Sequence, residues 1–275
     1  MKNLRLTAVL LLTLLLTACN GRQEGITATP TVTDVTPTEK AVTPTPTEAT
    51  ETPTEAPTEV PTPTEGQQKE EEENMAATLL YQGHGSLRIT TGDGKVIYVD
   101  PYAGTGYDKP ADLILMTHGH GDHTKDELIA TKNADCRKIT WVEALEGGKH
   151  QTFDLGYVKV EAVEAGYNKN HNVTQCVGFI LTFANGVQLY LSGDTSTTPQ
   201  MDSFAARGLD YAFLCCDGIY NMGIAEASAC AKKINAKHSI PYHMAPGKPY
   251  DEDVARQFEG PGRILLPAGT ELTLE

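Results

Sequence analysis

An apolar run leads into a cluster of histidines in residues 112–123, Asp112-Leu113-Ile114-Leu115-Met116-Thr117-His118-Gly119-His120-Gly121-Asp122-His123. Its apolar part leads directly into four side chains that can bind a metal, all within six residues: His118, His120, Asp122 and His123. Imidazole nitrogens and carboxylate oxygens suit Zn²⁺, and the intervening glycines let a tight loop turn several side chains toward one point. The alternative is a polar surface loop with incidental histidines, which the density of ligand types disfavours. We therefore predict a buried strand that ends in a metal site.

Residues 75–275 are enough for a single large core. The turn residues of 92–94 and 185–186 predict two hairpins, and the order αβαβα is expected from residue 201 onward. Two sheets packed face to face with helices outside would bury both sets of apolar faces. Strands are predicted over 78–81, 86–90, 95–99, 112–116, 138–142, 157–163, 177–183, 187–191, 211–215, 239–242, 264–266 and 271–274, and helices over 125–131, 201–207, 225–234 and 252–258.

The N-terminus reads as a secretory signal. Lys2 and Arg5 precede an apolar run from Leu6 to Leu16, which is shorter than the ~20 residues of a membrane-spanning helix. Residues 16–19, Leu-Thr-Ala-Cys, resemble the lipobox of bacterial lipoproteins. That resemblance implies cleavage after residue 18, lipidation of Cys19, and a location at the cell membrane on its extracytoplasmic face. An ordinary cleavable signal is the alternative.

Residues 19–74 are dominated by Thr, Pro and Glu and end in an acidic run from Glu70 to Glu73. Such a composition buries too little apolar surface to offset the entropy of ordering. We predict a disordered stalk that links the anchor at Cys19 to a hydrolase domain over 75–275.

The net charge of −14 is shared between the stalk and the domain. Residues 21–74 hold 12 acidic and 3 basic groups and the signal 2 basic ones, which leaves −7 for residues 75–275. Binding to phosphate-rich polymers depends on clusters of Lys and Arg. An acidic domain therefore argues against a nucleic-acid partner and favours a small-molecule substrate.

Five cysteines remain in the domain: Cys136, Cys176, Cys215, Cys216 and Cys230. Their odd number and irregular spacing do not indicate a disulfide framework, although one bridge stays open. Cys215 and Cys216 end an apolar run and are predicted to be buried strand residues.

The motif His-x-His-x-Asp-His resembles that of the metallo-β-lactamase superfamily, and the likeness extends over residues 76–275. Three further segments support it. Residues 192–195, Ser-Gly-Asp-Thr, look like the family's Gly-Asp-Thr segment, and 240–243, Ile-Pro-Tyr-His, like its late strand ending in a histidine. Residues 83–86 and 98–101 resemble the opening of the lactonase-like, UPF-type hydrolases. The resemblance implies an α/β fold, a four-layer αββα sandwich.

The resemblance also implies two divalent metal ions. Zinc is the metal expected, with manganese or iron as alternatives. His118 and His120 would bind the first ion, Asp122, His123 and His243 the second, and Asp194 both. A bridging water would be the nucleophile, with Asp122 and Asp194 as catalytic carboxylates. Two cations lower the pKa of such a water toward neutrality and polarise the scissile bond.

The chain departs from the family pattern at the further histidine that normally binds the first ion. His171, shifted along the loop 164–171, is the candidate by ligand type, with Asn168 or water as alternatives. Asp100 and His84 are not assigned as ligands. Asp100 is expected to orient a metal-bound histidine or the histidine loop, with a strand-ending turn as the alternative. His84 is placed near the pocket, with a structural histidine as the alternative.

The function expected from this site is hydrolysis of an ester, lactone, amide or phosphodiester, without a choice among them. Two other classes stay open. One is an iron-dependent redox protein, and the other is a non-catalytic metal- or ligand-binding surface lipoprotein. The oligomeric state is not indicated by the sequence.

Overall fold

A computed structural model of the protein describes residues 75–275. The predicted signal (1–18), the lipidation of Cys19 and the predicted stalk (19–74) lie outside the described residues. Among residues 75–275, no helix is both long and apolar enough to cross a membrane.

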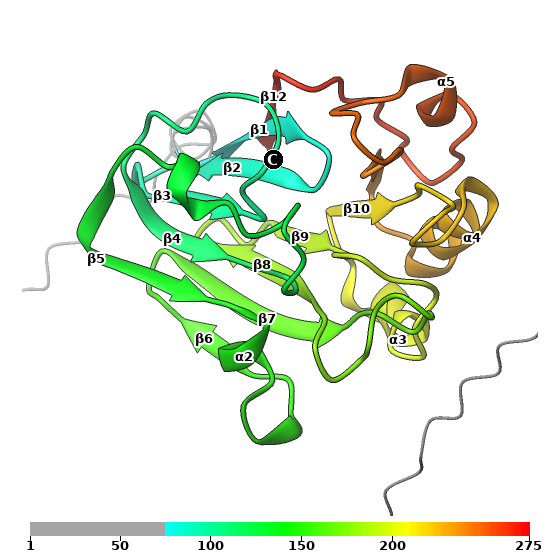
Figure 1. The fold of residues 1–275 in the computed structure, drawn as a ribbon, viewed down its shortest axis with the longest axis horizontal. Coiled ribbons are helices and arrows are strands. Elements are labelled where there is room, and N and C mark those ends of the chain that lie inside the picture. Colours follow the sequence, from blue (N-terminus) through cyan, green and yellow to red (C-terminus); the bar gives the residue numbers. More distant parts are fainter. Residues whose placement is uncertain (1–74) are drawn as a thin grey trace, which may run out of the picture. The chain divides into compact units, whose positions relative to one another are not determined.

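The described residues form two six-stranded mixed sheets. The first sheet pairs its strands antiparallel up to β3 and parallel thereafter. Its spatial order is β12 (Thr270–Leu274), β1 (Ala77–Gly83), β2 (Ser86–Thr90), β3 (Val96–Val99), β4 (Ala111–Leu115) and β5 (Lys132–Ile139). In Figure 1 its strands β1, β2 and β3 lie above β7 and β8 of the second sheet.

The second sheet has the same mixed character, with parallel pairing from β9 to β11 and antiparallel pairing elsewhere. Its order is β11 (His238–Tyr242), β10 (Tyr211–Cys215), β9 (Gln188–Leu191), β8 (Val177–Phe183), β7 (Val158–Glu164) and β6 (Thr152–Asp154). The predicted hairpin turns at 92–94 and 185–186 join β2 to β3 and β8 to β9, so both are confirmed.

The core fills the space between the sheets, because each contributes its apolar inner face to one buried cluster. Leu79 and Tyr81 of β1 belong to it, as do Phe179 and Leu181 of β8. Strands whose side chains alternate between the two faces need a cover on the outer face as well.

Helices provide that cover on the second sheet. α3 (Met201–Phe204) packs its Phe204 edge-on against Tyr190 of β9, with ring centroids 5.0 Å apart. α4 (Ile224–Ile234) buries one face, including Ala227, Ala231 and Ile234, at helical spacing. α5 (Glu252–Ala255) follows β11, which confirms the αβαβα order. Figure 1 shows α3 and α4 beside β9 and β10.

The outer face of the first sheet has a thinner cover. A separate buried cluster includes Tyr98, Tyr107, Ile114 and Ile129, and the Tyr98 hydroxyl donates to the Lys109 carbonyl at 2.9 Å. Tyr107 lies in the loop 101–110, and Ile129 directly follows the 3-10 turn η1 (Asp126–Leu128). The α/β sandwich is thus confirmed, while the helix predicted over 125–131 is wrong: only one 3-10 turn forms.

Two strand predictions are corrected. The strand predicted over 138–142 is β5, which spans Lys132–Ile139, and α2 (Trp141–Ala144) starts where it was expected to continue. Thr140 ends the strand with a capping box, since its hydroxyl accepts from the Val142 N–H and Glu143 accepts from the Thr140 N–H. Residues 264–266 form no strand. Only Ile264 bonds to β11, and Pro261 and Pro267 beside the segment lack N–H donors.

All five cysteines of the described residues are free. Cys215 and Cys216 are buried at the end of β10, as predicted.

Candidate metal centre

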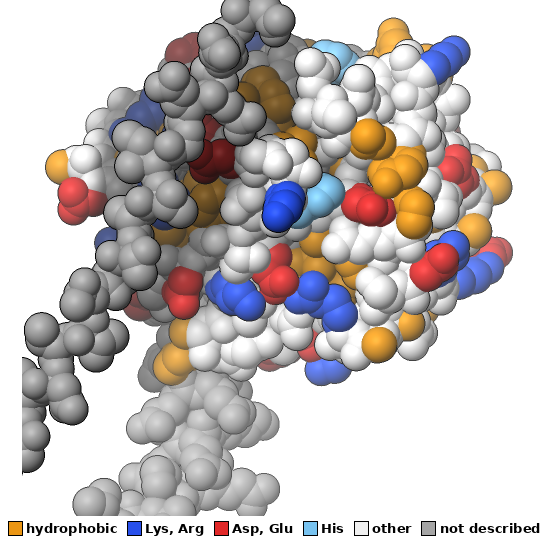
Figure 2. Space-filling model, turned by 90° about the horizontal axis from the view of Figure 1, so that it is seen from below, with side chains coloured by type: hydrophobic (Ala, Val, Ile, Leu, Met, Phe, Trp, Pro, Cys, Tyr) orange, Lys and Arg blue, Asp and Glu red, His pale blue; other side chains and the backbone are white. Residues whose placement is uncertain are grey.

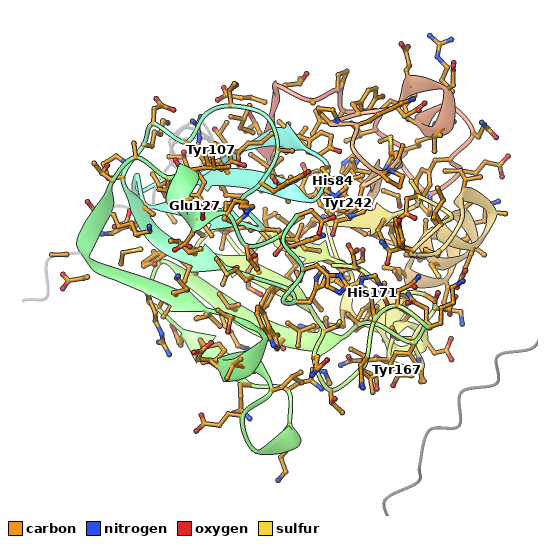
Figure 3. All side chains as sticks on the ribbon, viewed as in Figure 1. His84, Tyr107, Glu127, Tyr167, His171 and Tyr242 are labelled. Carbon is orange, nitrogen blue, oxygen red and sulfur yellow. The ribbon has the colours of Figure 1, made fainter. Side chains whose placement is uncertain are left out.

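The site lies where strands of both sheets end. β4 runs into the His118 loop, β9 into Asp194, and β11 into His243. The two sheets meet here, because the Val177 N–H donates to the Thr117 carbonyl at 2.9 Å. Figure 3 shows His84 and His171 on the same side of the molecule, although His84 lies in the turn between β1 and β2 of the first sheet and His171 in the loop between β7 and β8 of the second.

The seven side chains predicted as ligands come together in two groups and a bridge. In each group one candidate ligand atom per residue lies within 4.8 Å of all the others. The first group is His118, His120 and His171; the second is Asp122, His123 and His243, joined by His84; the bridging group is His118, His123 and Asp194.

Asp194 is buried between the groups. Its Oδ2 lies 3.3 Å from His171 Nε2 and 4.0 Å from His118 Nε2. Its Oδ1 lies 3.4 Å from the Nε2 atoms of both His123 and His243. One carboxylate thus offers one oxygen to each group.

The imidazole nitrogens that face Asp194 lack hydrogen-bond partners. Buried polar atoms are almost always paired, so such a cluster needs a physical reason. A metal ion would supply it, since ligand nitrogens must be unprotonated and directed at the ion. The unpaired atoms are Nε2 of His118, His123, His171 and His243, together with Asp194 Oδ1.

The opposite nitrogens of these rings face oxygen atoms. Asp100 Oδ2 accepts from His123 Nδ1 at 2.9 Å and from the Thr117 hydroxyl at 2.7 Å. That hydroxyl lies 3.1 Å from His118 Nδ1, which can donate to it. Asp100 therefore orients two histidines, one directly and one through Thr117, and leaves both Nε2 atoms free.

His171 is held in the same way, and His243 has a carboxylate beside its Nδ1. Asn168 Oδ1 lies 3.2 Å from His171 Nδ1 and accepts from the His171 N–H at 3.0 Å. Asp217 Oδ2 lies 3.3 Å from His243 Nδ1. Asn168 thus contacts His171, and the ligand set around Asp194 fits a pair of metal ions.

Comparison with known proteins agrees with this geometry. The profile of the beta-lactamase superfamily domain matches residues 78–243. A UPF0173 metal-dependent hydrolase of Geobacillus sp. (strain WCH70) is 33% identical over 226 residues, which cover 70% of this chain and 99% of the relative. The chain belongs to the UPF0173 metal-dependent hydrolases of the metallo-β-lactamase superfamily.

Solved structures show the same fold. A crystal structure from Parabacteroides distasonis, described as that of a metal-dependent hydrolase, has a TM-score of 0.58 and 30% identity and covers 69% of this chain and 92% of its own. The diiron β-hydroxylase CmlA from Streptomyces venezuelae has a TM-score of 0.51 at 15% identity, covers 72% of this chain and 54% of its own, and is similar in fold alone. The expectation of a metal-dependent hydrolase is confirmed at this level.

His84 contacts the second group of this hydrolase. Its Nε2 lies 3.2 Å from Asp122 Oδ2, and its ring centroid lies 3.7 Å from that of His243. Because an ionised carboxylate can only accept, Nε2 carries the proton and cannot bind a metal at the same time. This hydrogen bond is the largest cause of the lowered pKa of Asp122.

Electrostatics divide the buried histidines into two kinds. Burial lowers the pKa of His118 to about 2 and also lowers that of His171, so both are neutral and ready to bind a metal. For His123, burial is outweighed by Asp194 and Asp100, which raise its pKa to about 9. For His243, burial alone would lower the pKa, but Asp194 and then Asp217 outweigh this effect and raise it.

The same charges act on Asp194. Burial alone would raise its pKa, but His243, His123 and His118 together hold it well below its usual range. Asp194 is therefore ionised, and the second proton of His123, whose pKa is about 9, must leave when a metal binds.

Backbone strain gathers at this centre. Among residues 75–275, three of the five non-glycine residues with positive φ belong to it: His84 (53°), Asp100 (44°) and His243 (47°). Such conformations persist only where the surroundings impose them. Gly85 has a steric role here, since a Cβ atom on it would lie 2.9 Å from His123 Cε1.

Two contacts were not recognised from the sequence. Neither Asp217 nor Asn221 was predicted to contact a ligand. Asn221 Nδ2 donates to Asp194 Oδ2 at 2.8 Å and to Asp217 Oδ2 at 2.7 Å. The only signal was their position directly after the buried strand β10, next to two other strand ends that carry ligands.

Proposed function

We propose that this hydrolase binds two divalent cations, zinc in the first place and manganese or iron as alternatives. His118, His120 and His171 would hold the first ion, and Asp122, His123 and His243 the second. The observation that carries the proposal is the position of Asp194, whose two oxygens face one group each.

The reaction is hydrolysis of an ester, lactone, amide or phosphodiester of a small molecule. When bound, two such cations lower the pKa of a coordinated water and polarise the bond to be cleaved. His120 is exposed and the Asp122 side chain is 40% exposed, whereas the other ligands are buried. The substrate therefore approaches across His120 and Asp122.

The protein's own groups prepare this site. His84 keeps Asp122 ionised, Asp100 and Thr117 fix the orientation of His123 and His118, and Asp194 holds the two groups together. Prepositioned ligands reduce the reorganisation needed during the reaction.

The test combines elemental analysis with a substrate panel of esters, lactones, amides and phosphodiesters. We expect turnover that is lost when the metal is removed with a chelator and is restored when zinc is added. Iron, with a visible spectrum that changes on reduction, would favour a redox protein. A fully metallated chain without turnover of any substrate would favour a binding protein.

We further propose that the enzyme is displayed at the extracytoplasmic face of the membrane on a lipid at Cys19. The support is the lipobox-like sequence of residues 16–19. Metabolic labelling with radioactive palmitate should label the chain. After cell fractionation, the labelled chain should be found in the membrane fraction. If Cys19→Ala is labelled and sediments equally, the anchor proposal is wrong.

A further inference from the structure

Two hollows lie beside the metal centre, between the segment 141–150 and the loop 165–176. The first has a volume of about 270 Å³, and its lining includes His118, His120, His171, Trp141, Asn172 and Gln175. The second has a volume of about 230 Å³, and its lining includes Leu145, His150, Ala165, Tyr167, Val173 and Thr174.

The hollows share both walls. On one side, Trp141 and Leu145 are one helical turn apart, with the Leu145 N–H donating to the Trp141 carbonyl at 3.0 Å. Residues at this spacing lie on the same face of a helix. On the other side, Asn172 and Gln175 line the first hollow, and Val173 and Thr174 line the second. A third, open hollow of about 500 Å³ shares Tyr167 and Val173 with the second hollow and Asn172 and Gln175 with the first. The hollows therefore form one groove that starts at the metal centre.

The lining of this groove is largely uncharged. No Lys or Arg side chain lines either hollow within the described part of the chain. The acidic residue Glu164 lines the second hollow, and its Oε2 already accepts from the Gln200 N–H at 2.9 Å. Lys169 lines the open hollow that joins the two. The second hollow, which no proposed metal ligand lines, offers a phosphate or carboxylate group no cationic partner and suits an uncharged group.

Exposed apolar side chains are concentrated at the groove and on the neighbouring loop. Tyr167 and Val173 line the groove and are each 40% exposed, and Val142, next to Trp141, is 61% exposed. On the neighbouring loop, Ile219 and Tyr220 are 60% and 50% exposed. Clustered exposed apolar surface marks a binding site more often than scattered side chains do.

The surrounding surface is not strongly charged. On the part of the face that Figure 2 leaves uncovered, apolar side chains gather in clusters, and acidic and basic side chains intermingle without forming a basic patch. Long-range electrostatics therefore do not favour a polyanionic substrate on this face.

We propose that the groove between 141–150 and 165–176 is a subsite for an apolar acyl or aryl group, and that the substrate is a neutral ester, lactone or amide carrying such a group. This inference rests on the proposed function. Hydrolysis would add one water across the carbonyl bond and release the apolar acid together with an alcohol or amine. The apolar group would lie along Leu145, Tyr167 and Val173, with the carbonyl at the metal centre.

The first test measures binding by stopped-flow fluorescence directly after mixing, before octanamide can be turned over. Trp141 is the single tryptophan of the chain, so its fluorescence reports on the groove directly. Octanamide should change the fluorescence of the zinc-loaded full chain in a saturable way, whereas acetamide should not. Val173→Ser and Tyr167→Asn should weaken this response. Both side chains are partly exposed, and Asn tolerates the positive φ of 58° at position 167.

The second test measures turnover of 4-nitrophenyl acetate, butyrate and hexanoate. Burial of the chain predicts that kcat/KM rises by up to about fourfold per added methylene. The two groove variants should flatten this dependence. Leu128→Ser is the matched control, because Leu128 is 43% exposed and lines neither hollow.

The outcomes separate the two proposals. Turnover of the acetate ester without chain-length dependence, and no response to octanamide, would overturn the groove proposal and leave the hydrolase proposal standing. A saturable octanamide response that the groove variants weaken, without turnover of any ester, amide or phosphodiester, would support the groove and count against the proposed hydrolysis.

Discussion

Asn221 Nδ2 donates to Asp194 Oδ2 at 2.8 Å, and the same nitrogen lies 2.7 Å from Asp217 Oδ2. Asp194 is the carboxylate that both ligand groups share, and Asp217 lies 3.3 Å from His243 Nδ1. One amide group therefore ties the shared carboxylate to the residue behind His243. Such outer contacts fix the direction of a ligand and commonly matter nearly as much as the ligand itself.

Replacing Asn221 by Ala should weaken metal binding while the chain stays folded. Asp194 would lose a hydrogen bond that holds its Oδ2, and the affinity for zinc should fall about 10- to 100-fold. A competition titration with a coloured chelator measures this change. Asn170→Ala is the matched control, because Asn170 Nδ2 donates to the Tyr220 carbonyl and to no ligand. Equal zinc affinity in both variants would contradict the role given to Asn221.

Asp100→Asn should affect both stability and the metal centre. Asp100 Oδ2 accepts from His123 Nδ1 and from the Thr117 hydroxyl, and an amide NH₂ at that position would face two donors. Because the site is buried, the free energy of unfolding should fall by about 1–3 kcal/mol. Urea unfolding measures this loss, and zinc affinity should fall with it.

Asp112→Asn provides the comparison for Asp100→Asn. Asp112 lies in β4, the strand that pairs with β3, and Asp100 directly follows β3. The partners of Asp112 are Lys95, the Val96 N–H and Asn133, none of which is a ligand. Zinc affinity should be unchanged in this variant. If both substitutions weaken zinc binding alike, the contact between Asp100 and the histidines is not the cause.

Much of the sandwich could be predicted because alternating apolar residues and turn residues act locally. β2 and β10 were predicted with their observed bounds, and both hairpins formed. The start of β5 was predicted too far along the chain, because β5 is an exposed edge strand. Apart from Ile139, none of its residues is buried. Its pairing with β4 holds it, and that partner is not visible in a local pattern. The capping box at Thr140 was a local signal that the strand interpretation overlooked.

The site residues that lie in dense motifs could be predicted from the sequence. Those whose contacts depend on tertiary structure could not. The loop 118–123 concentrates ligands, so its members could be named from the sequence alone. His171 was inferred from ligand type, and the structure brings it to His118 and His120. Asp217 and Asn221 gave no such signal, because their role depends on β9, β10 and β11 ending side by side.

Gly85→Ala should damage the second ligand group by steric contact. A Cβ at position 85 would lie 2.9 Å from His123 Cε1 and 3.6 Å from His243 Cδ2. Overpacking of this kind costs about 1–3 kcal/mol and should displace His123. Thermal unfolding and zinc content measure the two effects. Gly121→Ala, where a Cβ would meet nothing within 4 Å, should leave both unchanged.

The metal-free enzyme should lose stability as the pH rises from 6.5 to about 9. The pKa of His123 in the folded chain is raised from 6.5 to about 9, and that of His243 is raised as well. A raised pKa means that the folded state binds protons more tightly, so this stabilisation is complete below pH 6.5 and is lost through the folded pKa. Calorimetry of the chelator-treated chain should show a falling Tm in this window. A Tm that rises there would contradict the assignment.

Elemental mass spectrometry of the purified full chain and of Asp194→Ala determines whether two metal ions share this carboxylate. We expect about two zinc ions per wild-type chain, with hydrolysis lost on chelation. Both ions should be lost in the variant, because each group uses one Asp194 oxygen. One ion or none in the wild type, or two ions retained by Asp194→Ala, would mean that no such pair of ions shares Asp194.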